Sequence, residues 1–147
     1  TVLPALRAQC PGAVVHLYGH SGPAPPGVVV HPAPVDAIEA FPADAVMALP
    51  LRIASGIRMR ILEAWARGLP VVASSVAARG LAVRDGEELL IADSAADFVD
   101  ALRRLSEPGL RARLVDAGRA YLRRWHDEAR CTEDLLAAYA DALQAPR

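Results

Sequence analysis

The sequence contains no lysine and no asparagine, so all sixteen of its basic residues are arginine. Alanine, in contrast, occupies thirty positions. Codon usage in a genome rich in G and C produces this composition without any selection on the chemistry of the protein. We therefore expect arginine at positions where related proteins carry lysine.

Cysteine is scarce as well. The two cysteines, Cys10 and Cys131, are too few for a disulfide framework. Neither lies at the spacing of a metal-binding motif. The chain therefore shows no sequence sign of a structural metal or of a disulfide-stabilised secreted domain.

The chain also lacks an excess of charge and a long apolar run. Sixteen basic and seventeen acidic residues leave a formal net charge of −1, which provides no broad basic surface for nucleic acid. Arginines interrupt each apolar run well before the roughly 18 residues that a spanning helix needs. The first residues show no basic region followed by an apolar one. We expect a cytoplasmic domain, or one held at the inner face of the membrane, without a transmembrane segment or a nucleic-acid partner.

Short β-branched runs alternate with helical segments in the first part of the chain. The run Val28-Val29-Val30 is apolar at consecutive positions, as in strands that are covered on both faces. Strands are predicted at 13–18, 28–31, 44–49, 71–74 and 89–92, and helices at 4–9, 36–41 and 57–67. Strands that alternate with helices indicate right-handed crossovers and a parallel sheet. We predict a Rossmann-like, doubly wound α/β fold, with residues 1–147 as a single domain.

The last part of the chain is predicted to be a helical tail, with helices at 95–105, 108–124 and 128–143. Ser94 and Asp97 form a capping-box pattern at the start of the first of these helices. Pro108 suits the first turn of the second helix, and Asp127 can cap the third.

Residues 50–74 carry the densest chemical signal and predict a strand end, a loop, a helix, a tight turn and a strand. The predicted helix is apolar around most of its circumference and has one polar stripe about 60° wide. Such a helix is buried between layers, with its stripe facing a cavity or a partner. Alternatively, Arg60 and Glu63 form a solvated pair at the helix edge. The stripe consists of Gly56, Arg60, Glu63 and Arg67.

Three arginines crowd the start of this helix, at Arg52, Arg58 and Arg60. The helix dipole disfavours cations at that end by about 0.3–1 kcal/mol each. An anion bound to the free backbone N–H groups offsets this cost, and Gly56 lets the backbone approach such a ligand closely. The position also follows the carboxyl end of a strand, where open α/β sheets bind their ligands. These residues predict a phosphate-bearing ligand.

Residues 56–73 read Gly-Ile-x-x-Arg-x-Leu-Glu-Ala-x-Ala-x-Gly-x-Pro-Val-Val-Ala. This pattern resembles the donor-site signature of family 4 (group 1) retaining glycosyltransferases, which have the GT-B fold. The likeness continues through Gly80-Leu81, residues 85–90 and residues 92–93 to the helical tail near Tyr139. It is similar in particular to bacterial sugar transferases of exopolysaccharide gene clusters, which carry lysine where this chain has Arg60.

The resemblance implies the C-terminal, donor-binding half of a two-domain enzyme, whose acceptor site lies mainly in an N-terminal domain of the same protein. It implies that the chain begins one strand into that half and that the isolated domain is inactive. The implied reaction transfers a sugar from a nucleoside diphosphate sugar to a hydroxyl acceptor with retention, in polysaccharide biosynthesis. No cofactor and no metal are expected, because the helix dipole and arginines neutralise the leaving diphosphate.

The resemblance also implies the roles of individual residues. The donor diphosphate would lie against Gly56, Ile57, Arg58 and Arg60, and Glu63 would bind the ribose hydroxyls. No protein nucleophile is expected, because the leaving phosphate acts as the base in a front-face attack.

One position departs from the family pattern. Many members carry a glutamate that contacts the donor sugar where this chain has Ser55, which can donate one hydrogen bond or cap the helix. Ser74 is expected to touch the donor, and Pro34 and Val35 are expected to form walls for the nucleobase. Two alternatives stay open. One is a nucleotide-sugar epimerase of the same GT-B architecture, and the other is a degenerate, non-catalytic nucleotide-binding or scaffold module, for which the departure at Ser55 is the best argument.

The last predicted helix carries one broad apolar face. The resemblance suggests that the C-terminal helices partly pack on the N-terminal domain. We therefore expect an exposed apolar patch in this chain and a tendency to self-associate. The residues of this face are Leu135, Leu136, Tyr139 and Leu143.

Overall fold

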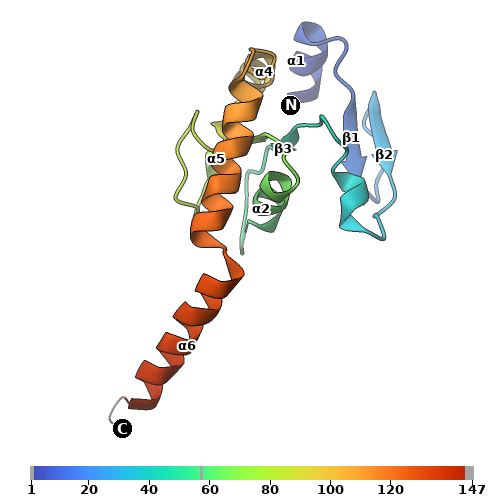
Figure 1. The fold of residues 1–147 in the computed structure, drawn as a ribbon. Helices are drawn as coiled ribbons and strands as arrows, with labels where there is room; N and C mark the ends of the chain where they lie inside the picture. Colours follow the sequence, from blue (N-terminus) through green and yellow to red (C-terminus); the bar gives the residue numbers. More distant parts are fainter. Residues whose placement is uncertain (1, 57, 145–147) are drawn as a thin grey trace.

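A computed structural model describes residues 2–56 and 58–144 of the chain (Figure 1). Within these residues, two strands form one parallel sheet and three strands form a second, in the order β3-β4-β5. Helices flank the strands, so the predicted α/β class is confirmed. The elements are α1 (Val2–Gln9), β1 (Val15–Tyr18), β2 (Val28–His31), η1 (Ala37–Ala40), β3 (Met47–Leu49), α2 (Met59–Ala66), β4 (Val71–Ala73), α3 (Ser75–Ala78), β5 (Leu90–Ile91), α4 (Ala95–Arg104), α5 (Leu110–Trp125) and α6 (Glu128–Gln144).

Strand β4 lies at the centre of the three-stranded sheet and is buried at every position. Successive side chains of a strand point to opposite faces, so its three residues contribute to two different cores. Val71 and Ala73 belong to the first buried cluster, whereas Val72 belongs to the second. The apolar run of the sequence therefore reflects a strand that is covered on both faces.

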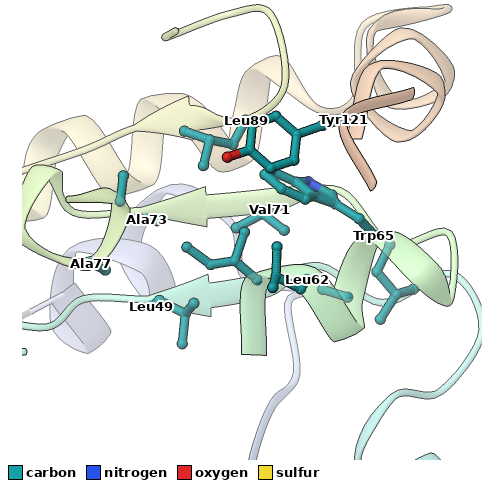
Figure 2. Packing of buried hydrophobic residues seen from close by; sticks show 12 residues of the cluster. Leu49, Leu62, Trp65, Val71, Ala73, Ala77, Leu89 and Tyr121 are labelled. Atoms are coloured by element: carbon teal, nitrogen blue, oxygen red, sulfur yellow. The ribbon is translucent and has the colours of Figure 1, made fainter. Parts of the chain in front are cut away.

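Helix α2 and strand β4 form much of the first cluster together with Tyr121 of α5 (Figure 2). The indole of Trp65 is fully buried, and its centroid lies 5.2 Å from the ring centroid of Tyr121. Gly118 makes room for this indole, because a Cβ at that position would overlap it. The close approach of α2 to α5 therefore depends on a glycine within α5.

The second cluster covers the other face of β4. Phe98 and Ala101 of α4 pack there with Leu110 and Leu114, which lie at the start of α5. Helix α5 thus contributes to both clusters, and the sheet is sandwiched between helical layers. The apolar area that these clusters remove from water supplies most of the driving force for folding, at about 25 cal/mol per Å².

Strands β1 and β2 form a separate two-stranded sheet. Its strands run parallel, with Val15 opposite Val28, but among the described residues neither strand contributes to the two buried clusters. The sequence predicts one continuous sheet, whereas the structure divides the strands into a pair and a triplet. Apolar runs in the sequence show where strands form, but they do not show which strands pair with each other. The division into two sheets could therefore not be predicted.

The predicted helix starts are partly correct. Ser94 Oγ accepts from the backbone N–H of Asp97, and Asp97 accepts from the N–H of Ser94, which confirms the capping box of α4. Hydrogen bonding to the side chain and then to the backbone N–H of Ser94 stabilises the carboxylate of Asp97 and lowers its pKa. Asp127 caps α6 by accepting from the N–H of Arg130. The placement of Pro108 in a first turn is wrong, because Gly109 takes the cap position in a left-handed conformation and α5 begins after it.

Other elements differ at their ends. The helix predicted at 36–41 is a single 3-10 turn, η1, and Asp36 accepts from the N–H of Ile38 at its start. Helix α2 begins at Met59 instead of residue 57. The short helix α3 was not predicted, because its one turn is too short to show a helical period; Ser74 caps it.

Helix α6 extends away from the rest of the molecule (Figure 1). None of its residues is buried. The prediction of an exposed apolar face on this helix is confirmed, since the four side chains concerned are more than half exposed. They are Leu135, Leu136, Tyr139 and Leu143.

Candidate functional site

The loop that follows β3 forms one wall of a cleft of about 350 Å³. The start of α2 and residue Ala77 of α3 complete it, so the cleft lies at the carboxyl end of strand β3. Ligands of open α/β sheets bind at this edge. The lining residues are Leu49, Leu51, Ile53, Ala54, Ser55, Arg58, Met59, Arg60, Ile61 and Ala77.

Ser74 fixes the loop beside this cleft. Its Oγ donates to the carbonyl of Leu51 at 2.6 Å and accepts from the N–H of Ala77 at 3.1 Å. Its backbone N–H also donates to the carbonyl of Leu49. The side chain is buried, and its hydrogen bond to Leu51 joins the segment after β3 to the end of β4, whereas its hydrogen bond with Ala77 caps α3. Ser74 therefore holds the loop in place, a role that the sequence did not predict.

The segment before α2 turns sharply at Gly56, which has a φ of 76°. No atom outside its immediate neighbours lies within 4 Å of the position that a Cβ would take, so this backbone is open to solvent. Arg58 occupies the cap position of α2 and makes no side-chain capping hydrogen bond. The prediction that Ser55 caps the helix is wrong, because α2 begins later and Ser55 lies in the loop that lines the cleft.

Arg58 is the most constrained of the arginines at the site. Its Nη1 donates to the carbonyl of Gly56, and its Nη2 lies 3.4 Å from the carbonyl of Val76. Its Nε is buried and has no hydrogen-bond partner among the described residues. The other partners of the guanidinium are neutral carbonyl groups, so its positive charge would stabilise an anion bound beside Arg58.

Arg60 extends from the first turn of α2 into the wall of the same cleft and is exposed. No acidic residue is among the described residues that line this cleft. Arg52, which the sequence placed with these two arginines, is exposed and does not line it. The cleft therefore has two arginines in its wall and a net positive charge.

Glu63 lies further along α2, outside the lining of this cleft. Its Oε1 is 3.6 Å from Nη2 of Arg67, so the alternative in which Glu63 pairs with Arg60 is wrong. The guanidinium of Arg67 also lies over the ring of Phe41, 5.0 Å from its centroid. Arg67 therefore holds the Glu63 carboxylate near the residue that ends η1. Both charged side chains are only about one third exposed.

The remaining predicted residues lie apart from the cleft. Pro34 and Val35 follow β2, as expected for residues at a strand's carboxyl end, and Val35 is fully exposed. They do not line the cleft beside α2. Ile57, predicted at the diphosphate site, lies outside the described residues.

A second cleft, of about 630 Å³, lies on the other side of Arg58, and the sequence did not predict it. The end of α5 and the residues after α3 form its far wall. These segments are distant in sequence, so only the positive charge of Arg79 beside Gly80 could have drawn attention to it. The lining residues are Gly56, Arg58, Arg79, Gly80, Leu81, Ala82, Tyr121, Trp125 and His126.

The described residues contain no group of three or more His, Cys, Asp or Glu side chains placed to hold a metal ion. Within residues 2–56 and 58–144, none of the helices has both the length and the apolar character to cross a membrane.

Two curated relatives are D-inositol 3-phosphate glycosyltransferases. The chain is 43% identical to that of Acidothermus cellulolyticus over 88 residues, which are 58% of this chain and 19% of the relative. It is 45% identical to that of Actinosynnema mirum over 84 residues, which are 55% of this chain and 20% of the relative. The chain thus spans about a fifth of the length of these relatives.

Solved structures show the same fold. A sucrose-phosphate synthase from Thermosynechococcus elongatus superposes on 99% of this chain and 42% of its own, with a TM-score of 0.76 and 21% identity. The C-terminal domain of a group 1 glycosyl transferase from Francisella tularensis superposes on 86% of this chain and 76% of its own, with a TM-score of 0.59 and 15% identity. The fold is that of GT-B glycosyltransferases, as the resemblance implies. Residues 2–107, well over half of the chain, match the family described as "Glycosyl transferases group 1", and the protein belongs to that family.

Proposed function

We propose that this chain is the donor-binding domain of a retaining glycosyltransferase and that its donor is a nucleoside diphosphate sugar. The observation that carries the proposal is the cleft beside α2, whose wall holds Arg58 and Arg60 and, among the described residues, no carboxylate. A diphosphate carries two to three negative charges, so it is the part of such a donor that this wall favours. The cleft also lies at the edge of the sheet where α/β proteins bind ligands.

The diphosphate would lie at the start of α2. Gly56 leaves the backbone open there, and the first N–H groups of a helix together with its dipole favour an anion. The guanidinium groups of Arg58 and Arg60, which line the cleft, would neutralise charge as the diphosphate leaves. Ile57 belongs to this proposed site through the resemblance alone. The domain needs no nucleophile of its own, because the leaving phosphate would act as the base.

Glu63 would bind the ribose. It lies five residues beyond Arg58, which corresponds to about 7.5 Å along the helix axis. A carboxylate accepts hydrogen bonds from two neighbouring hydroxyls, which is what a ribose 2′,3′-diol provides. The contact with Arg67 fixes the carboxylate at the side of α2 without removing it from solvent. One ligand could then span the helix start with its phosphates and the helix side with its ribose.

The proposal also assigns residues to the donor sugar and to the nucleobase. Ser55 lines the cleft and can donate one hydrogen bond to the donor sugar. Pro34 and Val35 would contact the base after β2. Ser74 would act on the donor mainly through the loop that it fixes.

The acceptor is a hydroxyl group held chiefly by the other half of a longer protein. The resemblance to exopolysaccharide transferases favours a growing polysaccharide, whereas the names of the curated relatives favour an inositol phosphate. No cofactor and no metal is part of the proposed reaction. We expect the domain to bind donors weakly by itself and to transfer no sugar.

Calorimetric titration of the chain with UDP, GDP and ADP tests this proposal. We expect at least one of them to bind and its affinity to fall as salt is added, because exposed charges are screened. Pyrophosphate should bind more weakly than the preferred nucleotide, since it lacks the ribose. If no nucleoside diphosphate binds, a non-catalytic scaffold module becomes the better assignment. Release of free sugar nucleotide isomers by the full-length protein would instead indicate an epimerase.

A further inference from the structure

The second cleft is distinct from the proposed donor site although the two share a wall at Arg58. Arg58 and Arg79 line it, and the ring of His126 adds a third group that can donate a hydrogen bond. None of the described residues that line the cleft is acidic. The lining of the cleft therefore carries a net positive charge.

The backbone of this cleft is accessible at two turns. Gly56 and Gly80 both have positive φ values, of 76° and 93°, and both line the cleft. At each of them, a Cβ would meet no atom within 4 Å beyond its neighbours. A ligand can therefore approach the main chain closely on both sides of Arg58.

The opposite wall is aromatic. Tyr121 is buried against Trp65, and its hydroxyl accepts from the backbone N–H of Ala82, which fixes the segment after Gly80. Trp125 is 44% exposed and lies near two further arginines, Arg124 at 4.9 Å and Arg130 at 5.7 Å from its ring centroid.

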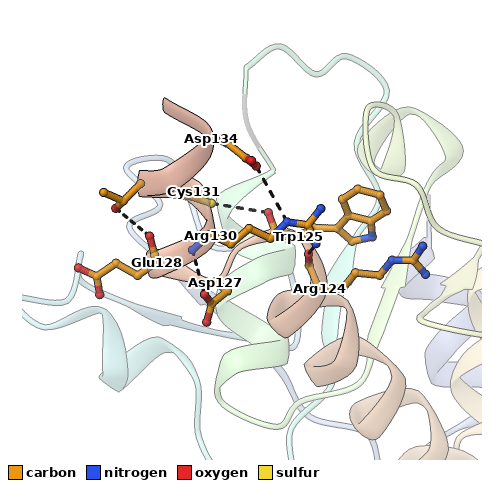
Figure 3. Close-up of polar contacts among 8 residues, drawn as sticks. Arg124, Trp125, Asp127, Glu128, Arg130, Cys131 and Asp134 are labelled. Atoms are coloured by element: carbon orange, nitrogen blue, oxygen red, sulfur yellow. Dashed lines mark hydrogen bonds and ion pairs between the residues drawn. The ribbon is translucent and has the colours of Figure 1, made fainter. Parts of the chain in front are cut away.

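Hydrogen bonds between α5 and α6 hold this wall in position (Figure 3). Nη1 of Arg130 donates to the carbonyl of Arg124 at 2.8 Å, and the thiol of Cys131 lies 3.8 Å from the carbonyl of Trp125. The rings of this wall offer apolar contact to a carbon skeleton, while Arg58 and Arg79 come from other segments that line the cleft.

We propose that this second cleft binds the phosphate group of a small phosphorylated molecule, such as a sugar phosphate. The phosphate would lie between Arg58 and Arg79, with His126 as a further donor. Arg58 lines both clefts, so its guanidinium can meet a phosphate oxygen where they adjoin. The carbon skeleton would contact Tyr121 and Trp125.

This placement also suggests a role. A molecule in the second cleft would lie next to the diphosphate of a donor in the first, because Arg58 belongs to both walls. A phosphorylated acceptor would thus be held close to the donor. This role depends on the proposed function, whereas binding of the phosphate itself does not.

The two clefts can be separated by matched variants of exposed arginines. Arg79 lines only the second cleft and Arg60 lines only the first. The chain and its Arg79→Ala and Arg60→Ala variants would be titrated with inorganic phosphate, glucose 6-phosphate, glucose and the preferred nucleoside diphosphate. Circular dichroism of each variant shows that it is folded, and tryptophan fluorescence reports on the second cleft through Trp125.

We expect glucose 6-phosphate to bind and glucose not to bind. Arg79→Ala should weaken the binding of glucose 6-phosphate by roughly 10- to 100-fold, the loss expected for a hydrogen bond to a charged group. Arg60→Ala should leave it unchanged and should weaken the nucleotide instead. If glucose 6-phosphate does not bind, or if Arg60→Ala weakens it as much as Arg79→Ala does, the second site is refuted. If glucose 6-phosphate binds through Arg79 while no nucleotide binds, the second site stands and the proposed donor function fails.

Discussion

Substitution of Glu63 by glutamine separates the proposed ribose contact from the ion pair that the structure shows. Glu63→Gln keeps the shape of the side chain and removes its charge and one acceptor site. The pair with Arg67 has a separation of 3.6 Å, with side chains 35% and 28% exposed. Solvent screens a pair of this kind, so its loss should lower the free energy of unfolding by no more than about 1 kcal/mol. The variant should therefore fold.

The expected effect on binding is larger. A hydrogen bond from a hydroxyl to a charged group contributes about 1–3 kcal/mol, which corresponds to a roughly 5- to 150-fold rise in Kd for the preferred nucleoside diphosphate. Pyrophosphate has no ribose, so its Kd should not change. Both Kd values are measured by calorimetry on the same preparation. Their ratio reports the contribution of the ribose contact to binding and is insensitive to a change in phosphate binding at the helix start.

Arg67→Gln is the matched control for this experiment. It breaks the same ion pair and leaves the Glu63 carboxylate in place. We expect it to keep most of the preference for the nucleoside over pyrophosphate. If Glu63→Gln retains the full preference of the parent chain, or if both variants lose it equally, Glu63 acts only as the partner of Arg67 and the ribose assignment is wrong.

Four further substitutions test other parts of the structure. Arg60→Ala should weaken nucleoside diphosphate binding by about 1.5–3 kcal/mol in calorimetry and reduce its salt dependence; an unchanged affinity would count against the anion site. Leu136→Glu in α6 should reduce self-association in analytical ultracentrifugation and the binding of a hydrophobic dye, unless the exposed face is inert. Gly118→Ala should destabilise the chain by about 1–3 kcal/mol in urea unfolding because its methyl group would overlap Trp65, and a stabilised variant would contradict this packing. Ser94→Ala should cost about 0.5–2 kcal/mol by removing the cap of α4, and an unchanged midpoint would show that the cap contributes nothing.

The elements that the sequence predicted well are those whose causes are local. The strand at 28–31 has its predicted bounds, because three valines in succession favour extended backbone wherever they lie. The capping box at Ser94 needs only residues within one helical turn, and it was also found. The start of α2 was misplaced by two residues, because the turn at Gly56 delays the helix and nothing in the apolar period marks that delay.

In the candidate site as well, the sequence predicted the features with local causes and missed those that depend on distant residues. The sequence could identify Arg58 and Arg60, because they surround one helix start. It could not show that Ser74 fixes the loop through Leu51, or that Arg67 rather than Arg60 contacts Glu63. Both Arg60 and Arg67 are at helical spacing from Glu63, and the contact of Arg67 with an aromatic ring from another part of the chain decides between them.

The alternation of β4 between two cores has a consequence for how the chain unfolds. Val72 and its neighbours on the strand pack into different clusters, so a defect that displaces β4 loosens both faces of the sheet at once. Residues from β3 through α5 should therefore open together, and their amide protons should exchange with solvent only when that whole unit unfolds. The described strands β1 and β2 contribute to neither cluster, so their amides can exchange by a separate opening of lower free energy. Hydrogen exchange would then be faster in the sheet of β1 and β2 than in the sheet of β3, β4 and β5.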